Sequence, residues 1–340
     1  MESRLSWLRF VRVTLLAGTL LAVVGCGSLG VALGTRTRLD KLPVVALEAS
    51  LSPQPTLSPG KSGRLILVAT TADGRKLTTV GAGKGTVLFD SFAFESTIAK
   101  VNGSGVVSLP ADPRVSDGHA AQVRTAVVGH PDVTANLEIP SRYDTAFEAH
   151  FSGSTGFSGA DGFDGISGSD GTVGSFDANS PSAGGNGGDG TNGTDGGRGG
   201  EGSPGESVHV WITPKPGSAS LLQVRASSAA HGEMFFLIDS NGGSLSLDAN
   251  GGAGGRGGSG GKGGRGGHGG LGLPQGPSGH DGQDGHDGST GFPGAAGRFI
   301  VTIDPAAQTY LDRFHFANRS GNGAAGPALQ VQTEAVAPLW

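Results

Sequence analysis

An acidic and histidine-containing stretch, GHDGQDGHDG at 279–288, holds the residues best suited to bind a metal ion: His280, Asp281, Asp284, His286 and Asp287. Imidazole and carboxylate groups are common metal ligands. Residues three apart in this run would lie about 9 Å from one another if the chain is extended with three residues per turn. That spacing is too wide for two ligands of one ion unless runs converge. We therefore expect a structural role, with no metal and no cofactor.

Two further sets of charges recur at the same spacing. Asp161, Asp164 and Asp170 form an acidic row, and Arg256, Lys262, Arg265 and His268 form a basic row. The rows are open to three interpretations: binding of cations, pairing of neighbouring runs, or a solvated face. We favour the solvated face, because exposed ion pairs contribute little stability.

Enzyme motifs occur only where the glycine-rich composition produces them. GGSGG around Ser259 and GNGGDG from Gly185 match a nucleophile elbow and a dinucleotide-binding fingerprint in letters alone. Neither lies between a strand and a helix, as those motifs require. The nine histidines are scattered, without an acid or nucleophile at a familiar spacing. The sequence predicts a protein that is not an enzyme.

The amino-terminal 25 residues have the features of a secretory signal. Arg4, Arg9 and Arg12 precede a short apolar stretch that ends in VVGC, with Cys26 the one cysteine of the chain. This ending resembles the lipobox of bacterial lipoproteins, which implies cleavage after Gly25 and lipid attachment to Cys26. The resemblance places the chain in the bacterial cell envelope, at the outer membrane or cell surface, held to the membrane by its lipid. An ordinary signal anchor is the alternative.

Glycine organises most of the remaining chain. Between 153 and 299 it occupies every third position in four runs of eight triplets, at 153–176, 184–207, 251–274 and 276–299. We number these runs one to four and call the positions after each fixed glycine x and y. A three-residue period with a bare column is typical of polyproline II helices, which can then pack closely. Gly also fills x in seven triplets of the third run and four of the second, but in none of the outer two.

This distribution predicts a single-chain bundle in which runs two and three are central and runs one and four lie at the edges. The repeats resemble the glycine-rich polyproline II bundles of snow flea antifreeze proteins and of certain phage tail adhesins. They also resemble the collagen-like repeats of bacterial surface proteins, so a homotrimer is the alternative to the favoured monomer. Only four prolines occupy the x and y positions, which is few for collagen. In a compact domain we expect each run to fold back at least once.

Short alternating strands flank the glycine runs. Residues 44–140 contain eight candidates separated by turn signals, HPD at 130–132 among them, which predicts a β-sandwich. Its end resembles a bacterial Ig-like domain of group 2. In the region 141–340, strand-rich units at 208–250 and 298–336 follow the second and fourth runs, and VWITP aligns with VTIDP. We expect these units to form a β-layer that clamps the bundle.

The predicted chain is therefore all-β plus polyproline II: a signal peptide at 1–25, a tether at 26–43, an Ig-like sandwich at 44–140, and a glycine-rich bundle with interleaved strands at 141–340. Net charge −5 and a pI near 6.0 argue against a nucleic-acid partner. The expected role is non-catalytic, presenting a rigid surface for adhesion or matrix assembly, with envelope or matrix components as possible partners. A glycan- or cation-binding module is the alternative.

Overall fold

The computed structural model describes residues 36–81 and 85–340, which divide into two compact units between Tyr143 and Asp144. Both units are built from β-strands, so the all-β prediction is confirmed. The helices of the described residues are three short 3-10 segments: η1 (Phe89–Ser91), η2 (Pro113–Val115) and η3 (Pro305–Arg313). The predicted cleavage site Gly25 and lipidation site Cys26 lie outside the described residues.

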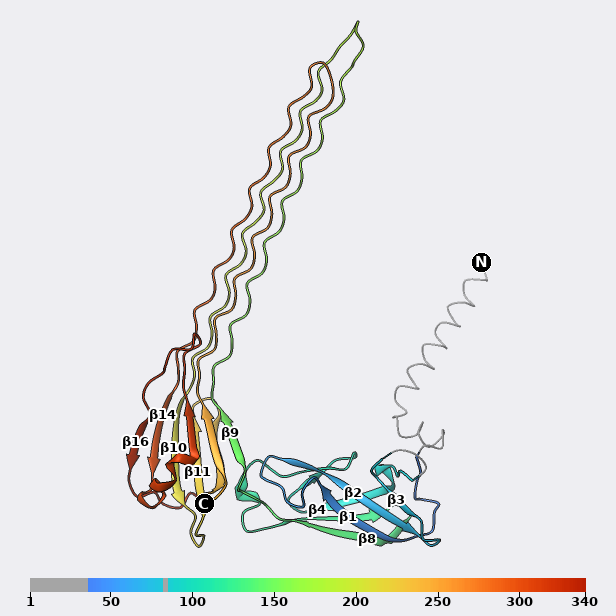
Figure 1. Ribbon diagram of the computed structural model, residues 1–340, viewed down its shortest axis with the longest axis vertical. Coiled ribbons are helices and arrows are strands. Elements are labelled where there is room, and N and C mark those ends of the chain that lie inside the picture. Colours follow the sequence, from blue (N-terminus) through green and yellow to red (C-terminus); the bar gives the residue numbers. More distant parts are fainter. Residues whose placement is uncertain (1–35, 82–84) are drawn as a thin grey trace. The chain divides into compact units, whose positions relative to one another are not determined.

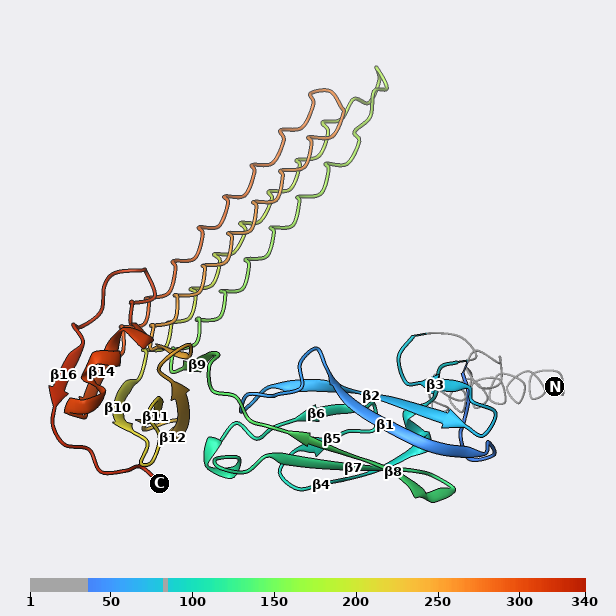
Figure 2. The same ribbon diagram turned by 60° about the horizontal axis from the view of Figure 1, so that its bottom comes forward.

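The first unit contains two antiparallel sheets (Figure 2). One sheet has the order β1-β2-β6-β5, with β3 also on β2, and consists of β1 (Val44–Ser52), β2 (Ser62–Thr71), β3 (Lys76–Thr78), β5 (Lys100–Val101) and β6 (Val106–Ser108). The other has the order β4-β7-β8, from β4 (Phe92–Ser96), β7 (Ala121–Val127) and β8 (His130–Ile139). Alternation places one side of each strand inside, as β7 shows by burying every second residue.

The two sheets share a core to which Leu67 of β2, Phe92 of β4 and Val127 of β7 contribute. Two details differ from expectation. The segment 36–43 does not stand clear as a tether, because Leu39 is fully buried in this core. The HPD segment is not a turn but the start of β8, since Gly129 at φ 87° supplies the left-handed turn residue just before it.

The second unit has a five-stranded and a three-stranded sheet. The first has the order β12-β11-β10-β14-β16, from β10 (Ser207–Pro214), β11 (Leu221–Ser228), β12 (Gly232–Asp239), β14 (Arg298–Ile303) and β16 (Gln330–Thr333). The other has the order β15-β13-β9, from β9 (Ala146–His150), β13 (Ser244–Asp248) and β15 (Phe314–Ala317). β10 and β14 are parallel, with Val210 opposite Val301 and Ile212 opposite Ile303. The residues paired in this register are those that the VWITP–VTIDP alignment matches, although the alignment predicted only a repeated unit and not a pairing.

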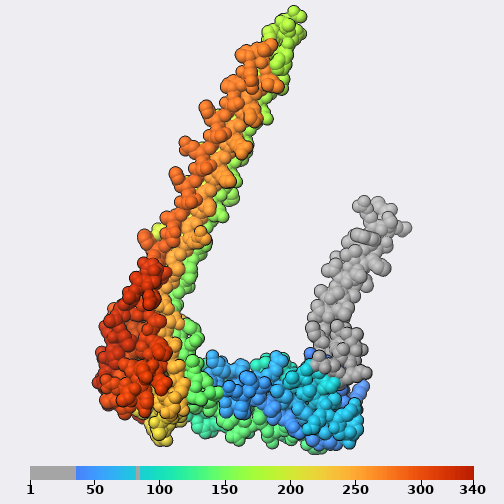
Figure 3. All heavy atoms as spheres, viewed as in Figure 1, coloured from blue at the N-terminus to red at the C-terminus, as the bar shows by residue number. Residues whose placement is uncertain are grey.

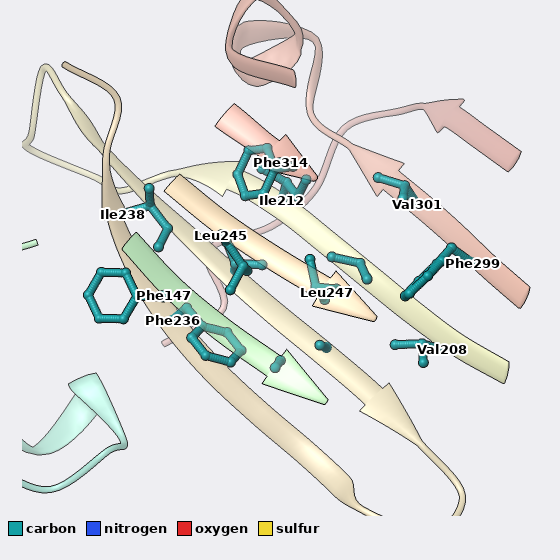
Figure 4. Packing of buried hydrophobic residues seen from close by; sticks show 14 of the residues in the cluster. Phe147, Val208, Ile212, Phe236, Ile238, Leu245, Leu247, Phe299, Val301 and Phe314 are labelled. Atoms are coloured by element: carbon teal, nitrogen blue, oxygen red, sulfur yellow. The ribbon is translucent and has the colours of Figure 1, made fainter. Parts of the chain in front are cut away.

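A single apolar core lies between these two sheets (Figure 4). Phe147, Leu245 and Leu247 come from the three-stranded sheet, while Val208 and Phe299 come from the five-stranded one. All are nearly inaccessible to solvent. Core residues alternate along each strand, so the sequence pattern fixes which side of each strand is buried.

The four glycine runs continue directly from the strands of this unit (Figure 1). β9 leads into the first run, the second run into β10, β13 into the third run, and the fourth run into β14. The expectation that each run folds back is wrong: hydrogen bonds join the first and third runs in one register from Gly153 to Gly174. The turns lie between runs, at the end of the bundle away from the sheets. The strands therefore form a base in line with the bundle, and do not clamp it from the side.

Hydrogen bonds between runs distinguish two inner runs from two outer ones. Runs two and three each bond with all three other runs, whereas runs one and four each bond only with runs two and three. The fixed glycines supply many of the donors, as Gly162 N to Ser259 O at 2.8 Å and Gly282 N to Gly264 O at 2.7 Å illustrate. The predicted order of edge, centre, centre, edge is confirmed. Figure 3 shows the narrow rod that results.

Candidate functional site: the glycine-repeat bundle

The fixed glycine column is required by backbone contact. A Cβ built on Gly162 would lie 2.0 Å from the Thr194 carbonyl oxygen, and one on Gly187 would lie 2.1 Å from that of Gly267. Such distances are far below van der Waals contact, so any side chain would push the runs apart. The bare column lets the carbonyl and N–H groups of neighbouring runs approach to hydrogen-bonding distance.

The second bare column is needed more strictly in the third run than in the second. A Cβ on Gly258 would lie 1.9 Å from the Ala160 oxygen, whereas one on Gly197 would lie 3.1 Å from the Ala160 nitrogen. The looser contact admits threonine in the second run. Thr194 Oγ1 accepts the Phe163 N–H at 2.7 Å, and Thr191 Oγ1 accepts that of Ile166 at the same distance.

Two acidic rows, Asp161, Asp164 and Asp170 on the first run and Asp281, Asp284 and Asp287 on the fourth, pair with a neighbouring run through its backbone N–H groups, and not through opposite charges as the pairing interpretation supposed. Each carboxylate accepts a backbone N–H from a neighbouring run: Asp161 from Ser259 at 2.8 Å, and Asp164 from Lys262 at 2.7 Å. The same contact recurs for every member of the two rows, namely Asp170 with His268, Asp281 with Gly266, Asp284 with Gly263, and Asp287 with Gly260. The rows are therefore not simply solvated faces, because they accept backbone N–H groups that have no carbonyl partner on a neighbouring run.

The second run carries a third set of such acceptors. Asp189 and Asp195 accept the backbone N–H groups of His280 and His286, each at 2.7 Å, and Asn192 accepts that of Gln283 at 2.8 Å. Asn192 indicates that an amide oxygen serves as well as a carboxylate. What these y positions share is an oxygen two bonds beyond Cβ, at the reach needed to meet the neighbouring backbone.

The five residues considered for metal binding are thus engaged separately along the bundle. Asp281, Asp284 and Asp287 turn toward the third run, while His280 and His286 take part through their backbones in contacts with the second. In the described part of the chain, no three His, Cys, Asp or Glu side chains gather closely enough to hold a metal ion. The basic row of Arg256, Lys262, Arg265 and His268 is exposed along the third run.

Large apolar side chains are exposed along the first run, a feature that the charge-based reading of the sequence did not identify. Phe157, Phe163 and Ile166 are 76%, 79% and 76% exposed, and Ala160 between them is exposed as well. These four occupy consecutive x positions. Another exposed apolar group surrounds the distal turns, formed by Val173, Phe176, Leu271 and Leu273. The sequence could have indicated this exposed apolar row, because the x positions of the first run hold no charged residue.

A polar cluster lies where the first run leaves β9. Asp248 accepts a hydrogen bond from Ser152 Oγ and contacts His150 Nδ1, and Ser152 Oγ in turn accepts the Asn250 N–H at 2.8 Å. A nucleophilic serine requires the histidine to stand between it and the acid. Here the acid stands between the serine and the histidine, so the cluster has the order of a structural network. It fixes the junction between strand and bundle.

The outer face of the five-stranded sheet carries an aromatic and charged group. His209 stacks on Trp211 with 3.7 Å between ring centroids, and Arg225 lies 3.9 Å above the same ring while contacting Glu233 at 3.3 Å. Burial, and secondly the positive charge of Arg225, lower the pKa of His209. A groove of about 340 Å³ separates Trp211 from the carboxyl-terminal residues 334–339.

Other sequence candidates take no part in a catalytic arrangement. Ser259 lies within the third run, where its N–H bonds to Asp161, and Gly185 lies within the second run, where its N–H bonds to the Thr172 carbonyl. Neither is at a strand-to-helix turn. Within residues 36–81 and 85–340, each helix is too short or too polar to cross a lipid bilayer.

Comparison with known proteins adds no relative: no protein-family model, curated protein sequence or solved structure matches this chain.

Proposed function

We propose that this chain is a non-catalytic lipoprotein of the bacterial cell envelope. It presents the glycine-repeat bundle, which we call the stem, as a rigid element with an adhesive or structural role. The observation that carries the proposal is the uninterrupted ladder of hydrogen bonds among four runs, which extends from the sheets to the distal turns. A bundle held at every third residue resists bending. It exposes a long surface while the strands at its base supply the apolar core that the runs lack.

The runs are proposed to be polyproline II helices, and the first unit an Ig-like spacer. Support for the helices comes from the three-residue repeat of the ladder and from glycine N–H groups that bond between runs. Support for the spacer comes from two antiparallel sheets that share a core. The lipobox around Cys26 supports attachment to the membrane.

A single-chain bundle is favoured over a collagen-like trimer. The fixed glycines of runs one, two and four donate to another run of the same chain, except Gly153 and Gly297, which donate to Asn250 and Ala249 just before the third run. In a triple helix the glycine N–H groups would have to bond to a different chain. Sedimentation of residues 36–340 tests this point, because a collagen-like trimer would sediment as three chains and melt to monomers.

Adhesion is tested in cells of the source bacterium that express altered chains. Cys26→Ser is expected to abolish lipid labelling and release the chain from the membrane fraction. Gly258→Val with Gly261→Val should disrupt the bundle and reduce surface attachment, whereas Gly197→Ala, at the looser contact, should leave attachment unchanged. Antibody against the first unit would verify equal display. Full attachment by the disrupted variant at equal display would contradict the proposal.

A further inference from the structure

The exposed apolar column of the first run is the strongest unexplained surface of the bundle. Its members, Phe157, Ala160, Phe163 and Ile166, follow one another in consecutive triplets and are bounded by Ser154 and Ser169. An exposed row of large apolar side chains is uncommon on a soluble surface and commonly marks an interface. We call this row the apolar strip.

The apolar strip is held in place by the second run. Thr194 and Thr191 accept the backbone N–H groups of Phe163 and Ile166 through their hydroxyl oxygens. The Phe157 ring lies over Gly200, where a Cβ would come within 2.6 Å of it. A surface whose backbone and rings are already ordered loses little entropy when a partner binds.

We propose that the apolar strip binds the same strip of a second copy of this chain, with the two stems antiparallel. This inference rests on the proposed function, for which it names a partner. The partner is indicated by the order of sizes along the strip. A two-fold axis midway between Ala160 and Phe163 places each Phe163 opposite the small Ala160 of the other copy. It also places Phe157 opposite Ile166, and Ser154 opposite Ser169. Such self-complementarity is what an isologous dimer requires.

Charges beside the apolar strip fit the same axis. Gly159 N donates to the Arg256 carbonyl, so Arg256 lies at the level of Gly159 along the stem. Asp164 lies on the same flank, because it accepts the Lys262 N–H of the third run. Rotation about the axis brings Asp164 of the second copy to the level of Gly159, and therefore to that of Arg256. Opposite charges thus meet on both sides of the axis, while the two Asp161 carboxylates, which lie on this flank because each accepts the Ser259 N–H, meet each other at the axis itself.

The available area predicts weak association. Large apolar side chains offer roughly 150 Å² each, so the strip presents on the order of 500 Å² per copy. The pair would bury about 1,000 Å², at the small end of specific interfaces. Weak binding between single molecules becomes strong when many anchored copies face one another, because the contacts then act together.

The test is sedimentation of residues 36–340 over chain concentrations from about 10 μM to about 1 mM, the range in which a weak dimer becomes populated. Wild type is expected to shift from monomer to dimer. Phe163→Ala leaves a gap and Ala160→Phe sets two rings against each other, so each should weaken the dimer at least about tenfold. The double variant Ala160→Phe/Phe163→Ala exchanges large and small at the axis, and should restore association. Phe292→Ala, on the fourth run, is the matched control and should have no effect.

Circular dichroism and thermal melts of each variant would show that the bundle remains folded. A chain that is monomeric at every concentration, or a double variant that binds no better than the single ones, would overturn the proposal. If the monomer floats with phosphatidylcholine vesicles and Phe163→Ala does not, the strip binds a lipid surface instead and the proposal is overturned. If association is absent while Gly258→Val with Gly261→Val reduces attachment as expected, the self-association fails and the adhesive function stands.

Discussion

A Cβ on Gly258 would lie 1.9 Å from the Ala160 carbonyl oxygen, so the third run approaches the first as closely as a hydrogen-bonded backbone allows. A Cβ on Gly197 of the second run would lie 3.1 Å from the nitrogen of the same residue, which is a much looser contact. Neither glycine has a positive φ, so their backbones could accept another residue. The difference between them is therefore one of contact alone.

Alanine substitution should separate these two glycines. Gly258→Ala must displace a run and is expected to destabilise the bundle by about 3 kcal/mol or more. Gly197→Ala requires a shift of a few tenths of an ångström, offset by the lower entropy of the unfolded chain, and should change stability by less than about 1 kcal/mol. Thermal melts followed by circular dichroism would measure both. Equal effects would show that the two columns are equally constrained.

The aspartates of the first run should be replaceable by asparagine but not by alanine. Asp161, Asp164 and Asp170 each accept one N–H, and Asn192 shows that an amide can do so. The triple alanine variant is expected to lose about 0.5–1.5 kcal/mol per missing bond. The triple asparagine variant is its control. If both melt at the wild-type temperature, these contacts contribute nothing to stability.

His209 should make the second unit less stable in mild acid. The folded state lowers its pKa from an ordinary value of 6.5, through burial and then the charge of Arg225. Below about pH 6.5 His209 therefore binds a proton more readily in the unfolded chain than in the folded chain. The free energy of unfolding consequently falls as the pH falls. His209→Phe keeps a ring against Trp211 and removes the proton. We would measure the melting temperatures of wild type and His209→Phe from pH 7.5 to pH 5, a range of about 2.5 units. The melting temperature of wild type should fall more steeply in acid than that of the variant. Parallel curves would contradict this assignment.

Gln223 should hold the carboxyl-terminal residues on the sheet. Its amide nitrogen donates to the Trp340 carbonyl at 3.1 Å and its oxygen accepts the Leu339 N–H at 3.0 Å, while only 1% of the residue is exposed. Gln223→Leu keeps the volume and removes both bonds, at a cost of about 1–3 kcal/mol. Trp340, which packs edge-on to Phe235, should then become more accessible to a fluorescence quencher. Glu233→Gln, on the neighbouring strand, should leave that accessibility unchanged. Quenching of Trp340 identical in wild type and Gln223→Leu would contradict this role.

The glycine count was enough to predict which runs are inner and outer, because a bare column has no other structural use. Alternation was enough to predict most strands, and the VWITP–VTIDP alignment predicted the repeated unit but not the pairing of β10 with β14. β9 was missed because Ala146–His150 is a short alternating segment between a loop and the first glycine run. Its strand character depends on pairing with β13, nearly a hundred residues away.

The role of the acidic rows could not be read from the sequence. Spacing places Asp161 and Asp164 on one column, but it does not say that the neighbouring N–H lies within reach of Cγ oxygens. That depends on the stagger between runs, which the hydrogen-bond register sets. The prediction that each run folds back is wrong for a related reason. It holds only for a compact domain, whereas a bundle that satisfies its own backbone has no need to fold back on a core.

Because the four runs share one hydrogen-bond register, the length of the stem cannot change in one run alone. Removing a triplet from one run would put every more distal contact of that run out of step with its neighbours, displacing Asp161 from Ser259 and Gly258 from Ala160 alike. Only the loss or gain of one triplet in all four runs at once preserves the pairing. Stems of this design should therefore differ in length among their descendants by whole layers, each layer made of four short pieces that are distant in the gene.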